Sequence, residues 1–414
     1  MTSLGRRAVL AGIALARPAL ARGEARVAVV GGGFGGATCA RALKRAGLAV
    51  TLIEPESTYA ACPLSNAVIA GARSWERQLF RHEALERGGI LVIRHAATGV
   101  DATARRVVLG DGTRLPYDRL VLSPGIELRF DALPGYDKAA ADILPHAWKA
   151  GPQTGLLRRQ LEAMEDGGTV VMAVPENPYR CPPGPYERAS LIAHYLKAHK
   201  PRSKLLVLDA KDSFSKQRLF QSAWAKLYPG LLEHVPLSGG GRVVSVDAAA
   251  RRVSTEFGDH AGDVVNVIPP QRAGLIAREA GAADRSGWCP VDPVTFESAM
   301  VPGLHVIGDA VIGGAMPKSA FSAAAQARVC AAAVASLLQD RVPAVPKLIN
   351  TCYSLVAPDY GISVAGVYRP ANGLLAEVEG AGGTSPLDAP PAFRALEAGY
   401  AEDWFGTATA EAFG

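Results

Sequence analysis

A glycine-rich turn between an apolar strand and a helix constrains the fold more than any other feature of this sequence. The strand is expected to end at Val30, and the turn reads Gly-Gly-Gly-Phe-Gly-Gly over residues 31–36. Gly31 permits the tight turn, Gly33 allows a pyrophosphate to approach the backbone, and Gly36 allows the helix to pack closely on the strand. The start of the helix adds free N–H groups and the positive end of the helix dipole for phosphates.

An acid follows this turn at the spacing that a dinucleotide site requires. A second apolar strand is expected over Ala49–Ile53, and Glu54 ends it. The Glu54 carboxylate can accept hydrogen bonds from an adenosine ribose, and its charge disfavours a 2′-phosphate. Phe34, inside the turn, belongs to the same set of contacts. The sequence therefore predicts a Rossmann unit that binds FAD or NAD.

A second motif favours FAD. A short strand from Leu304 ends in Gly308-Asp309, and an Ala-rich helix is expected to begin at Pro317. This resembles the second FAD motif of two-dinucleotide-binding-domain flavoproteins, whose aspartate holds the ribityl chain. The resemblance implies that role for Asp309, with an ordinary strand-end turn as the alternative. Lys318 and the helix dipole would then stabilise reduced, anionic flavin.

The segment that should hold a second nucleotide lacks the glycine turn. Strands are expected over Gly168–Val174 and Lys204–Asp209, but the connection between them is rich in proline from Pro175 to Pro185. Prolines lock φ and remove backbone donors, so this turn cannot cradle a pyrophosphate. We expect residues 132–261 to form a Rossmann-like domain without a nicotinamide nucleotide fingerprint.

Residues 1–23 have the pattern of an export signal. Arg6 and Arg7 precede a short apolar run, and the segment ends in Ala19-Leu20-Ala21. The paired arginines indicate the twin-arginine route and a periplasmic protein, and a frayed helix is the alternative. The run is about half the roughly 20 residues that span a bilayer, and we expect no membrane span elsewhere. The net charge of +5 includes three arginines within residues 1–21, so the remaining balance does not suggest a nucleic-acid partner.

The six cysteines form no C-x-x-C pair, and the histidines show no metal-ligand spacing, so we expect no metal site. Cys181 lies in the proline turn beside Arg180 and just before a helix expected over Tyr186–Ala198, an environment that favours thiolate. Cys352 lies far along the chain from Cys181. Composition alone leaves open a structural disulfide or two unrelated thiols. Cys39, Cys289 and Cys330 are assigned no chemistry.

Six segments give the sequence a more specific resemblance. These are Cys181–Ser190, Phe214–Gln217, Ile268–Gly274, Gly287–Asp292, Asn350–Ser354 and Asp359–Ala365. From about residue 26 to the C-terminus the chain resembles the flavoprotein subunit of flavocytochrome c sulfide dehydrogenase. The resemblance implies a redox-active disulfide between Cys181 and Cys352, and FAD bound covalently through Cys62 within Tyr-x-x-Cys-x-x-Ser-Asn. It also implies that Glu187 is a base, although a first-turn acid serving only the helix dipole is equally compatible.

The resemblance implies an α/β fold with glutathione-reductase-like Rossmann domains and a C-terminal α+β domain. The FAD-binding domain is expected over residues 24–131 and 262–345, and a C-terminal interface domain over 346–414. The implied activity is oxidation of sulfide, or of a persulfide, to zero-valent sulfur or polysulfide, with a c-type cytochrome as partner and electron acceptor. No C-x-x-C-H is present for haem in this chain.

Three alternatives are weighed against this interpretation. A sulfide:quinone oxidoreductase would need an apolar or basic amphipathic surface, whereas the segment from Pro391 carries Glu397, Glu402, Asp403 and Glu411 and suits a contact with another protein. An NADH dehydrogenase is disfavoured by the proline turn. A non-turnover flavoprotein partner of a sulfur-oxidising system remains a further possibility. Trp404 is assigned to the core rather than to the flavin.

Overall fold

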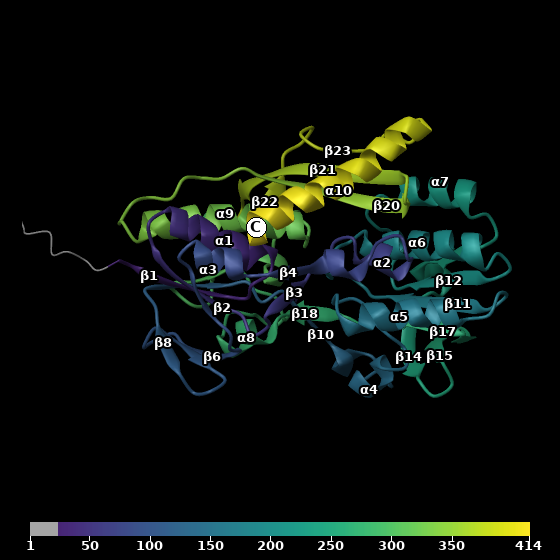
Figure 1. Ribbon diagram of the computed structural model, residues 1–414, viewed down its shortest axis with the longest axis horizontal. Helices are drawn as coiled ribbons and strands as arrows, with labels where there is room; N and C mark the ends of the chain where they lie inside the picture. The colour runs from purple at the N-terminus through teal and green to yellow at the C-terminus, as the bar shows by residue number, and fades with distance from the viewer. Residues whose placement is uncertain (1–23) are drawn as a thin grey trace, which may run out of the picture.

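The computed structural model describes residues 24–414, so the expected export signal lies outside the described residues. Two Rossmann-type sheets lie at opposite ends of the molecule, and a C-terminal sheet and long helix cross above both (Figure 1). The site described below is built where these three parts meet.

The first sheet is parallel and five-stranded. Its order is β19 (Leu304–Val306), β9 (Arg119–Leu122), β1 (Arg26–Val30), β2 (Ala49–Ile53) and β5 (Leu91–Ile93). Its central strands are nearly continuous apolar runs because helices cover both faces. A hairpin with its turn at Asp111-Gly112 joins β7 (Arg106–Leu109) and β8 (Arg114–Pro116), and β6 (Ala97–Asp101) completes this small sheet.

Two helices pack together on this sheet. Helix α1 (Phe34–Arg45) starts directly after Gly33, as expected. Helix α9 (Ala320–Leu337) begins at Ala320 rather than at Pro317, because the Ser319 side chain caps it by accepting a hydrogen bond from the Ser322 N–H at 3.0 Å. Helix α9 is long and apolar enough to cross a bilayer, but 61% of it is buried inside the protein against its neighbours.

The inserted domain has a four-stranded parallel sheet. Its order is β13 (Leu232–Val235), β12 (Lys204–Asp209), β11 (Thr169–Val174) and β17 (Val264–Val267). Because β17 pairs with β11, the inserted domain extends to about Val267 rather than ending at residue 261. The sequence did not separate β17 from the first domain, since a short valine-rich strand fits either sheet.

Further elements complete these two domains. In the inserted domain they are α4 (Lys138–Ala141), α5 (Pro152–Ala163), α6 (Gly184–His199), α7 (Gln217–Leu227), β14 (Val243–Asp247), β15 (Arg252–Thr255) and β16 (Gly258–Ala261). Elsewhere they are β3 (Thr58–Ala60), α2 (Ser65–Ile69), β4 (Leu79–Arg81), α3 (Glu83–Arg87), β10 (Ile126–Leu128), β18 (Gln271–Ala273) and α8 (Leu275–Glu279). Strands β10 and β18 pair where the chain enters and leaves the inserted domain.

The C-terminal part is a sheet with one long helix. The strands are β20 (Leu348–Ala357), β21 (Tyr360–Ala371), β22 (Leu374–Glu377) and β23 (Gly383–Thr384), and the helix is α10 (Pro391–Phe413). Strand β20 packs on both α6 and α9, so it touches both Rossmann domains. It is thereby positioned to bring Cys352 to the boundary between them.

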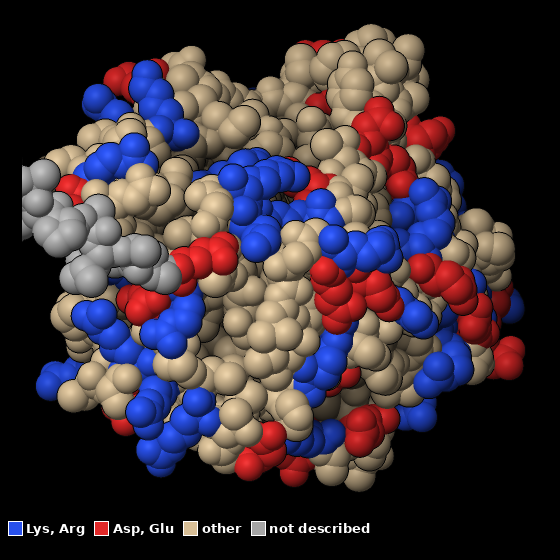
Figure 2. Space-filling view, turned by 60° about the vertical axis from the view of Figure 1, so that its left-hand side comes forward, with Lys and Arg blue, Asp and Glu red and all other residues tan. Residues whose placement is uncertain are grey.

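Three of the four acids on α10 are used inside this chain. Glu397 accepts a hydrogen bond from Ser363 Oγ on β21 at 2.7 Å, Glu402 pairs with Arg73 at 2.6 Å, and Glu411 pairs with Arg328 at 2.6 Å. The expectation that these acids face a partner is therefore corrected, because they attach the helix to its own protein. Asp403 is the exposed acid of the four. On the face in Figure 2, basic and acidic side chains are interspersed.

Candidate active site

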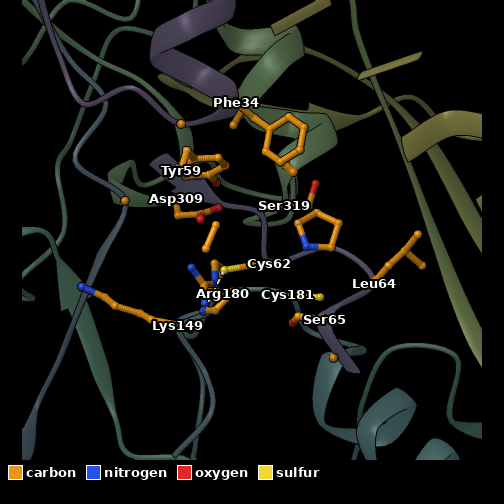
Figure 3. A pocket seen from close by; sticks show the side chains of 18 of the residues that line it. Phe34, Tyr59, Cys62, Leu64, Ser65, Lys149, Arg180, Cys181, Asp309 and Ser319 are labelled. Atoms are coloured by element: carbon orange, nitrogen blue, oxygen red, sulfur yellow. Dashed lines mark hydrogen bonds between the residues drawn. The ribbon is translucent and has the colours of Figure 1, made fainter. Parts of the chain in front are cut away.

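A cavity of about 890 Å³ lies where the three parts of the chain meet, a size suited to a cofactor. The segments of its wall include the glycine turn, the loop around Cys62, the turn from Arg180 to Gly184, Gly308-Asp309, the start of α9, and β20 at Cys352. Figure 3 shows Phe34 and Tyr59 at one end and Cys62, Arg180 and Cys181 together near the centre. Segments far apart in sequence therefore build one site.

The glycine turn has the geometry that the fingerprint predicts. Gly31 has φ +97°, and a Cβ there would lie 2.3 Å from the Ser123 carbonyl oxygen. A Cβ on Gly36 would lie 1.7 Å from the Gly31 carbonyl oxygen, so only glycine allows α1 to approach the strand. Gly33 lines the cavity at the start of α1, and the first turn of this helix has no acidic residue. The N–H groups at this helix start are suited to a pyrophosphate.

Glu54 stands beside this turn at the end of β2. Its carboxylate accepts hydrogen bonds from the Gly32 N–H at 2.6 Å and the Glu56 N–H at 3.0 Å. Both Glu54 and Phe34 line the cavity. The Phe34 ring contacts Tyr59 edge-on, with ring centroids 6.0 Å apart. The acid is thus placed for a ribose next to the phosphate-binding turn.

Asp309 has a buried hydrogen-bond acceptor that is left unsatisfied within residues 24–414. Its Oδ1 atom is buried and has no hydrogen-bond partner among the described residues, and the side chain lines the cavity. Burial raises the pKa of Asp309, an effect that the nearby cations Arg180 and Lys318 oppose. A buried acceptor without a donor is costly, and a hydroxyl of a ribityl chain would satisfy it. The residues present therefore fit FAD.

Lys318 is not placed as expected. Its ammonium donates hydrogen bonds to the backbone carbonyls of Asp309 at 2.9 Å and Val311 at 2.5 Å, and it lies 3.8 Å from the centre of the Trp288 ring. Lys318 does not line the cavity. Its backbone carbonyl instead accepts a hydrogen bond from the Cys181 N–H at 2.8 Å. The side chain therefore stabilises the turn after β19 rather than contributing charge at the flavin position.

Arg180 is the cation that sequence reasoning missed in this role. Its side chain lies against Cys62 in the middle of the cavity (Figure 3), and it donates a hydrogen bond to the Trp148 carbonyl. Burial disfavours its charge, but Cys62, Asp309 and Tyr59 outweigh burial and raise the pKa of Arg180. A permanent positive charge can stabilise an anionic reduced flavin. Its position next to Cys181 in the proline turn was the available signal.

Cys62 lies on the loop between β3 and α2, with its Sγ in the cavity. The Ala150 N–H donates to this Sγ at 3.4 Å. The thiol therefore faces the same space as Asp309 and the glycine turn. This is where a thioether to a bound flavin would have to form.

Cys181 sits in a tight turn at the start of α6. It has a left-handed backbone with φ +56°, and its carbonyl accepts a hydrogen bond from the Gly184 N–H at 2.8 Å. Burial raises the pKa of the Cys181 thiol, and the neighbouring Cys352 and Glu187 raise it further, while Arg180 acts in the opposite direction. The expectation that this environment favours thiolate is therefore corrected, because burial outweighs the adjacent arginine.

Cys352 reaches the same cavity from β20. It lines the same cavity wall as Cys181. Both are free thiols in this structure. The Cys352 Sγ accepts a hydrogen bond from Asn350 Nδ2 at 3.3 Å, and Asn350 Oδ1 accepts from Ser319 Oγ at 2.7 Å. The start of α9 is thereby connected to this cysteine.

Glu187 lies in the first turn of α6 and also lines the cavity. Its carboxylate accepts hydrogen bonds from Asn66 Nδ2 and from the Leu355 N–H, each at 3.1 Å. Burial raises the pKa of Glu187, although these two donors and Lys216 oppose the shift. An acid with a raised pKa beside two thiols is suited to accept and return a proton.

The second nucleotide position is closed. Asp209, at the end of β12 where a ribose-binding acid would lie, is fully buried. Its carboxylate accepts hydrogen bonds from Tyr186 Oη at 2.7 Å and Lys211 Nζ at 2.6 Å, and it contacts His234 Nε2 at 3.0 Å. The inserted domain therefore keeps the Rossmann sheet, while the carboxylate at the ribose position is already bonded by neighbouring side chains.

The remaining candidates divide clearly. Cys39, Cys289 and Cys330 are buried away from the cavity. Trp404, expected in the core, instead lines the cavity and stacks on Phe321 with ring centroids 5.9 Å apart. Within residues 24–414, no group of three His, Cys, Asp or Glu side chains could hold a metal ion.

Comparison with known proteins finds matches to one flavoprotein family. The family model for the central part of the sulfide dehydrogenase [flavocytochrome c] flavoprotein chain matches residues 154–269. The flavocytochrome c sulphide dehydrogenase flavin-binding model matches residues 344–413. The flavoprotein chain of this enzyme from Chlorobaculum thiosulfatiphilum is 52% identical over 48 residues, covering 11% of this chain and 100% of that sequence. The chain belongs to the flavocytochrome c sulfide dehydrogenase flavoproteins.

More distant relatives share the fold of this family. A pyridine nucleotide-disulphide oxidoreductase model matches residues 25–154. The mitochondrial sulfide:quinone oxidoreductase of Mus musculus is 21% identical over 344 residues, which are 78% of this chain and 73% of that protein.

Solved structures agree at the level of architecture. The sulfide:quinone oxidoreductase of Aquifex aeolicus superposes with a TM-score of 0.69 at 14% identity, covering 94% of this chain and 92% of that one. Putidaredoxin reductase, in its covalent complex with putidaredoxin, superposes with a TM-score of 0.66 at 19% identity, covering 92% and 93%. The expected α/β fold of a two-domain flavoprotein is confirmed, and this family member is a flavoprotein.

Proposed function

We propose that this flavoprotein oxidises sulfide to zero-valent sulfur at a Cys181–Cys352 disulfide and passes the electrons through FAD to a c-type cytochrome. One observation carries the proposal: both cysteines line the cavity whose glycine turn and unsatisfied Asp309 fit FAD. The closed second nucleotide position supports a donor other than NADH, because Asp209 has no free oxygen for a ribose.

The chemistry begins with a thiol–disulfide exchange. Hydrosulfide attacks one sulfur of the disulfide, a new S–S bond forms to it, and the old S–S bond breaks. The products are a persulfide on one cysteine and a thiolate on the other, and no electrons have yet left the protein. Glu187 accepts the proton that hydrogen sulfide loses on becoming hydrosulfide. Restoring the disulfide with release of sulfur requires an acceptor for two electrons.

FAD, when bound, supplies that acceptor, because it takes two electrons together and can release them singly. Gly31, Gly33 and Glu54 would hold its adenosine diphosphate half, and Asp309 would hold the ribityl chain. Phe34 would contact the cofactor beside the glycine turn. Cys62 is proposed to bind the flavin covalently, since its Sγ faces the same cavity.

A c-type cytochrome is proposed as acceptor because the family is named for its flavocytochrome c. A haem takes one electron at a time, which suits the stepwise release that flavin permits. A quinone would instead require a surface that enters lipid. We also propose a periplasmic location, on the basis of the signal pattern of residues 1–23.

The test follows flavin absorbance and acceptor reduction under anaerobic conditions. Sulfide should bleach the flavin of the wild-type holoenzyme and then drive reduction of a c-type cytochrome faster than reduction of a soluble quinone. Bleaching of the flavin by NADH in place of sulfide would contradict sulfide as the electron donor. Faster reduction of quinone than of cytochrome would contradict a c-type cytochrome as the acceptor. Bleaching without turnover on either acceptor would favour a non-turnover partner of a sulfur-oxidising system.

A further inference from the structure

Lys216 is a buried cation at the redox site that the steps above do not use. It caps α7 in a left-handed conformation with φ +62°, and its side chain reaches β20. Its ammonium donates hydrogen bonds to the Cys352 carbonyl at 2.8 Å, to Ser354 Oγ at 2.8 Å and to the Ile362 carbonyl at 3.4 Å. The inserted domain therefore places a positive charge against the cysteine-bearing strand.

This ammonium has no direct counter-ion. No carboxylate oxygen of residues 24–414 forms an ion pair with Lys216, and its three hydrogen-bond partners are all neutral. The side chain is only 8% exposed. A buried charge without an opposite charge is unfavourable. The residue would be stabilised whenever a negative charge developed next to it.

Four titratable groups face Lys216 from the elements around it. They are Cys352 on β20, Glu187 on α6, Cys181 in the turn before α6, and Glu397 on α10. Burial lowers the pKa of Lys216 to about 8, and these four groups act in the opposite direction, with Cys352 the strongest. Covalent geometry keeps the Cys352 Sγ within about 8 Å of the ammonium that binds its own carbonyl.

We propose that Lys216 is a positioning residue that stabilises anionic sulfur on Cys352. The inference rests on the proposed function, in which hydrosulfide brings one negative charge into the cavity. When the S–S bond breaks, that charge resides on sulfur, as a thiolate or as a persulfide anion. The ammonium at the Cys352 carbonyl balances this charge, while Asn350 Nδ2 donates a hydrogen bond to the same sulfur. Arg180 is occupied elsewhere, against Cys62 and Asp309.

The test measures how readily the Cys352 thiol ionises. The holoenzyme is reduced with dithiothreitol, freed of reductant, and labelled with iodoacetamide between pH 5 and 10, and mass spectrometry follows the Cys352 peptide. In Lys216→Met and Lys216→Gln the pH at which Cys352 labelling reaches half its maximal rate, its midpoint, should rise by roughly 1 to 2 pH units. Labelling at pH 7 should slow about tenfold or more. Lys216→Arg should restore the wild-type midpoint.

Two further variants separate charge from structure. Ser354→Ala removes one acceptor of the ammonium but keeps the charge, so its midpoint should stay at the wild-type value. Lys211→Met removes another buried lysine of the same domain, which pairs with Asp209 rather than facing Cys352, and should also leave the midpoint unchanged. Lys216→Gln retains donors for the neighbouring carbonyls and serves as the test if Lys216→Met does not fold.

An unchanged midpoint in a folded neutral variant would overturn the inference, as would an equal rise in Lys211→Met. Flavin content and thermal midpoint establish that each variant is folded. Because labelling needs no sulfide, it is independent of the proposed activity. A wild-type enzyme that fails to oxidise sulfide, yet shows the Lys216-dependent midpoint, would contradict the proposed function and leave the role of Lys216 standing.

Discussion

The Glu187 carboxylate accepts a hydrogen bond at 3.1 Å from the backbone N–H of Leu355, which lies just beyond Cys352 on the same strand. This contact ties the first turn of α6, which follows Cys181, to the strand that carries the second cysteine. Glu187 therefore connects the two chain segments that carry the cysteines of the proposed disulfide. Its protonation state matters for the chemistry, because burial raises the pKa of Glu187.

Glu187→Gln should slow sulfide-dependent flavin reduction by roughly 10²- to 10⁴-fold near neutral pH, because the proton acceptor is lost. The wild-type rate should rise with pH through the raised pKa of Glu187, since only the ionised carboxylate accepts a proton. The deficit of the variant should shrink above the pKa of hydrogen sulfide, where hydrosulfide needs no base. Stopped-flow measurement across pH checks this, and a deficit independent of pH would indicate a purely structural acid.

Cys181→Ser and Cys352→Ser should each retain flavin but lose sulfide-dependent bleaching to below about 1% of the wild-type rate, and the double variant should be no worse. The two sulfurs act as a unit, so either loss removes the disulfide. Cys330→Ala, in the buried helix α9, is the control and should keep its rate. Equal activity in either serine variant would rule out a disulfide mechanism.

We expect the flavin to stay with the denatured chain of the wild-type protein. In Cys62→Ser the flavin should be released on denaturation. The Cys62 Sγ faces the cavity, and a serine oxygen does not form the same thioether. Acid precipitation followed by measurement of flavin absorbance in pellet and supernatant tests this, with mass spectrometry of the Cys62 peptide. Free flavin from the wild-type protein would show that the cofactor is not covalently attached.

Asp309→Ala should lower the flavin bound per chain, because the buried acceptor without a partner is removed. A hydrogen bond to a charged group contributes about 1.5–3 kcal/mol, which corresponds to roughly a 10- to 100-fold loss of affinity. Asp403→Ala, on the exposed side of α10, should not change flavin content. The ratio of flavin to protein absorbance measures both, and equal flavin in the two variants would exclude a direct contact.

Glu402→Gln should lower the free energy of unfolding by about 1–3 kcal/mol, because it leaves the Arg73 guanidinium buried and without its carboxylate. Glu411→Gln breaks a more exposed pair with Arg328 and should cost about 0–1 kcal/mol. Urea unfolding compares the two variants. Equal losses of unfolding free energy in the two variants would mean that the burial of Arg73 contributes little to the docking of α10.

Local patterns predicted the fold where one sequence window contains the whole signal. Strands β2 and β12 have the bounds expected from their apolar runs, and α1 begins where the glycine turn places it. The presence of Asp309, Cys62 and Cys352 on one cavity is consistent with the residues that the family resemblance selected.

The directions in which side chains point could not be predicted from the sequence. Lys318 follows the second flavin motif in the chain, yet its ammonium binds backbone carbonyls beside Trp288. The acids of α10 look free in sequence, but the arginine partner of Glu402 lies on the loop after α2 and that of Glu411 lies on α9, both far from α10 along the chain. Such pairs exist only after folding, so no local pattern encodes them.

Phe413, in the last turn of α10, packs against Phe34 at the start of α1 and against Tyr59, with ring centroids 5.5 and 5.2 Å apart. Both of those side chains line the cofactor cavity. The backing of that wall therefore comes from a helix that is far along the chain from the glycine turn it supports. Loss of α10 would open the dinucleotide pocket at the back, so retention of the cofactor depends on this helix being folded in place.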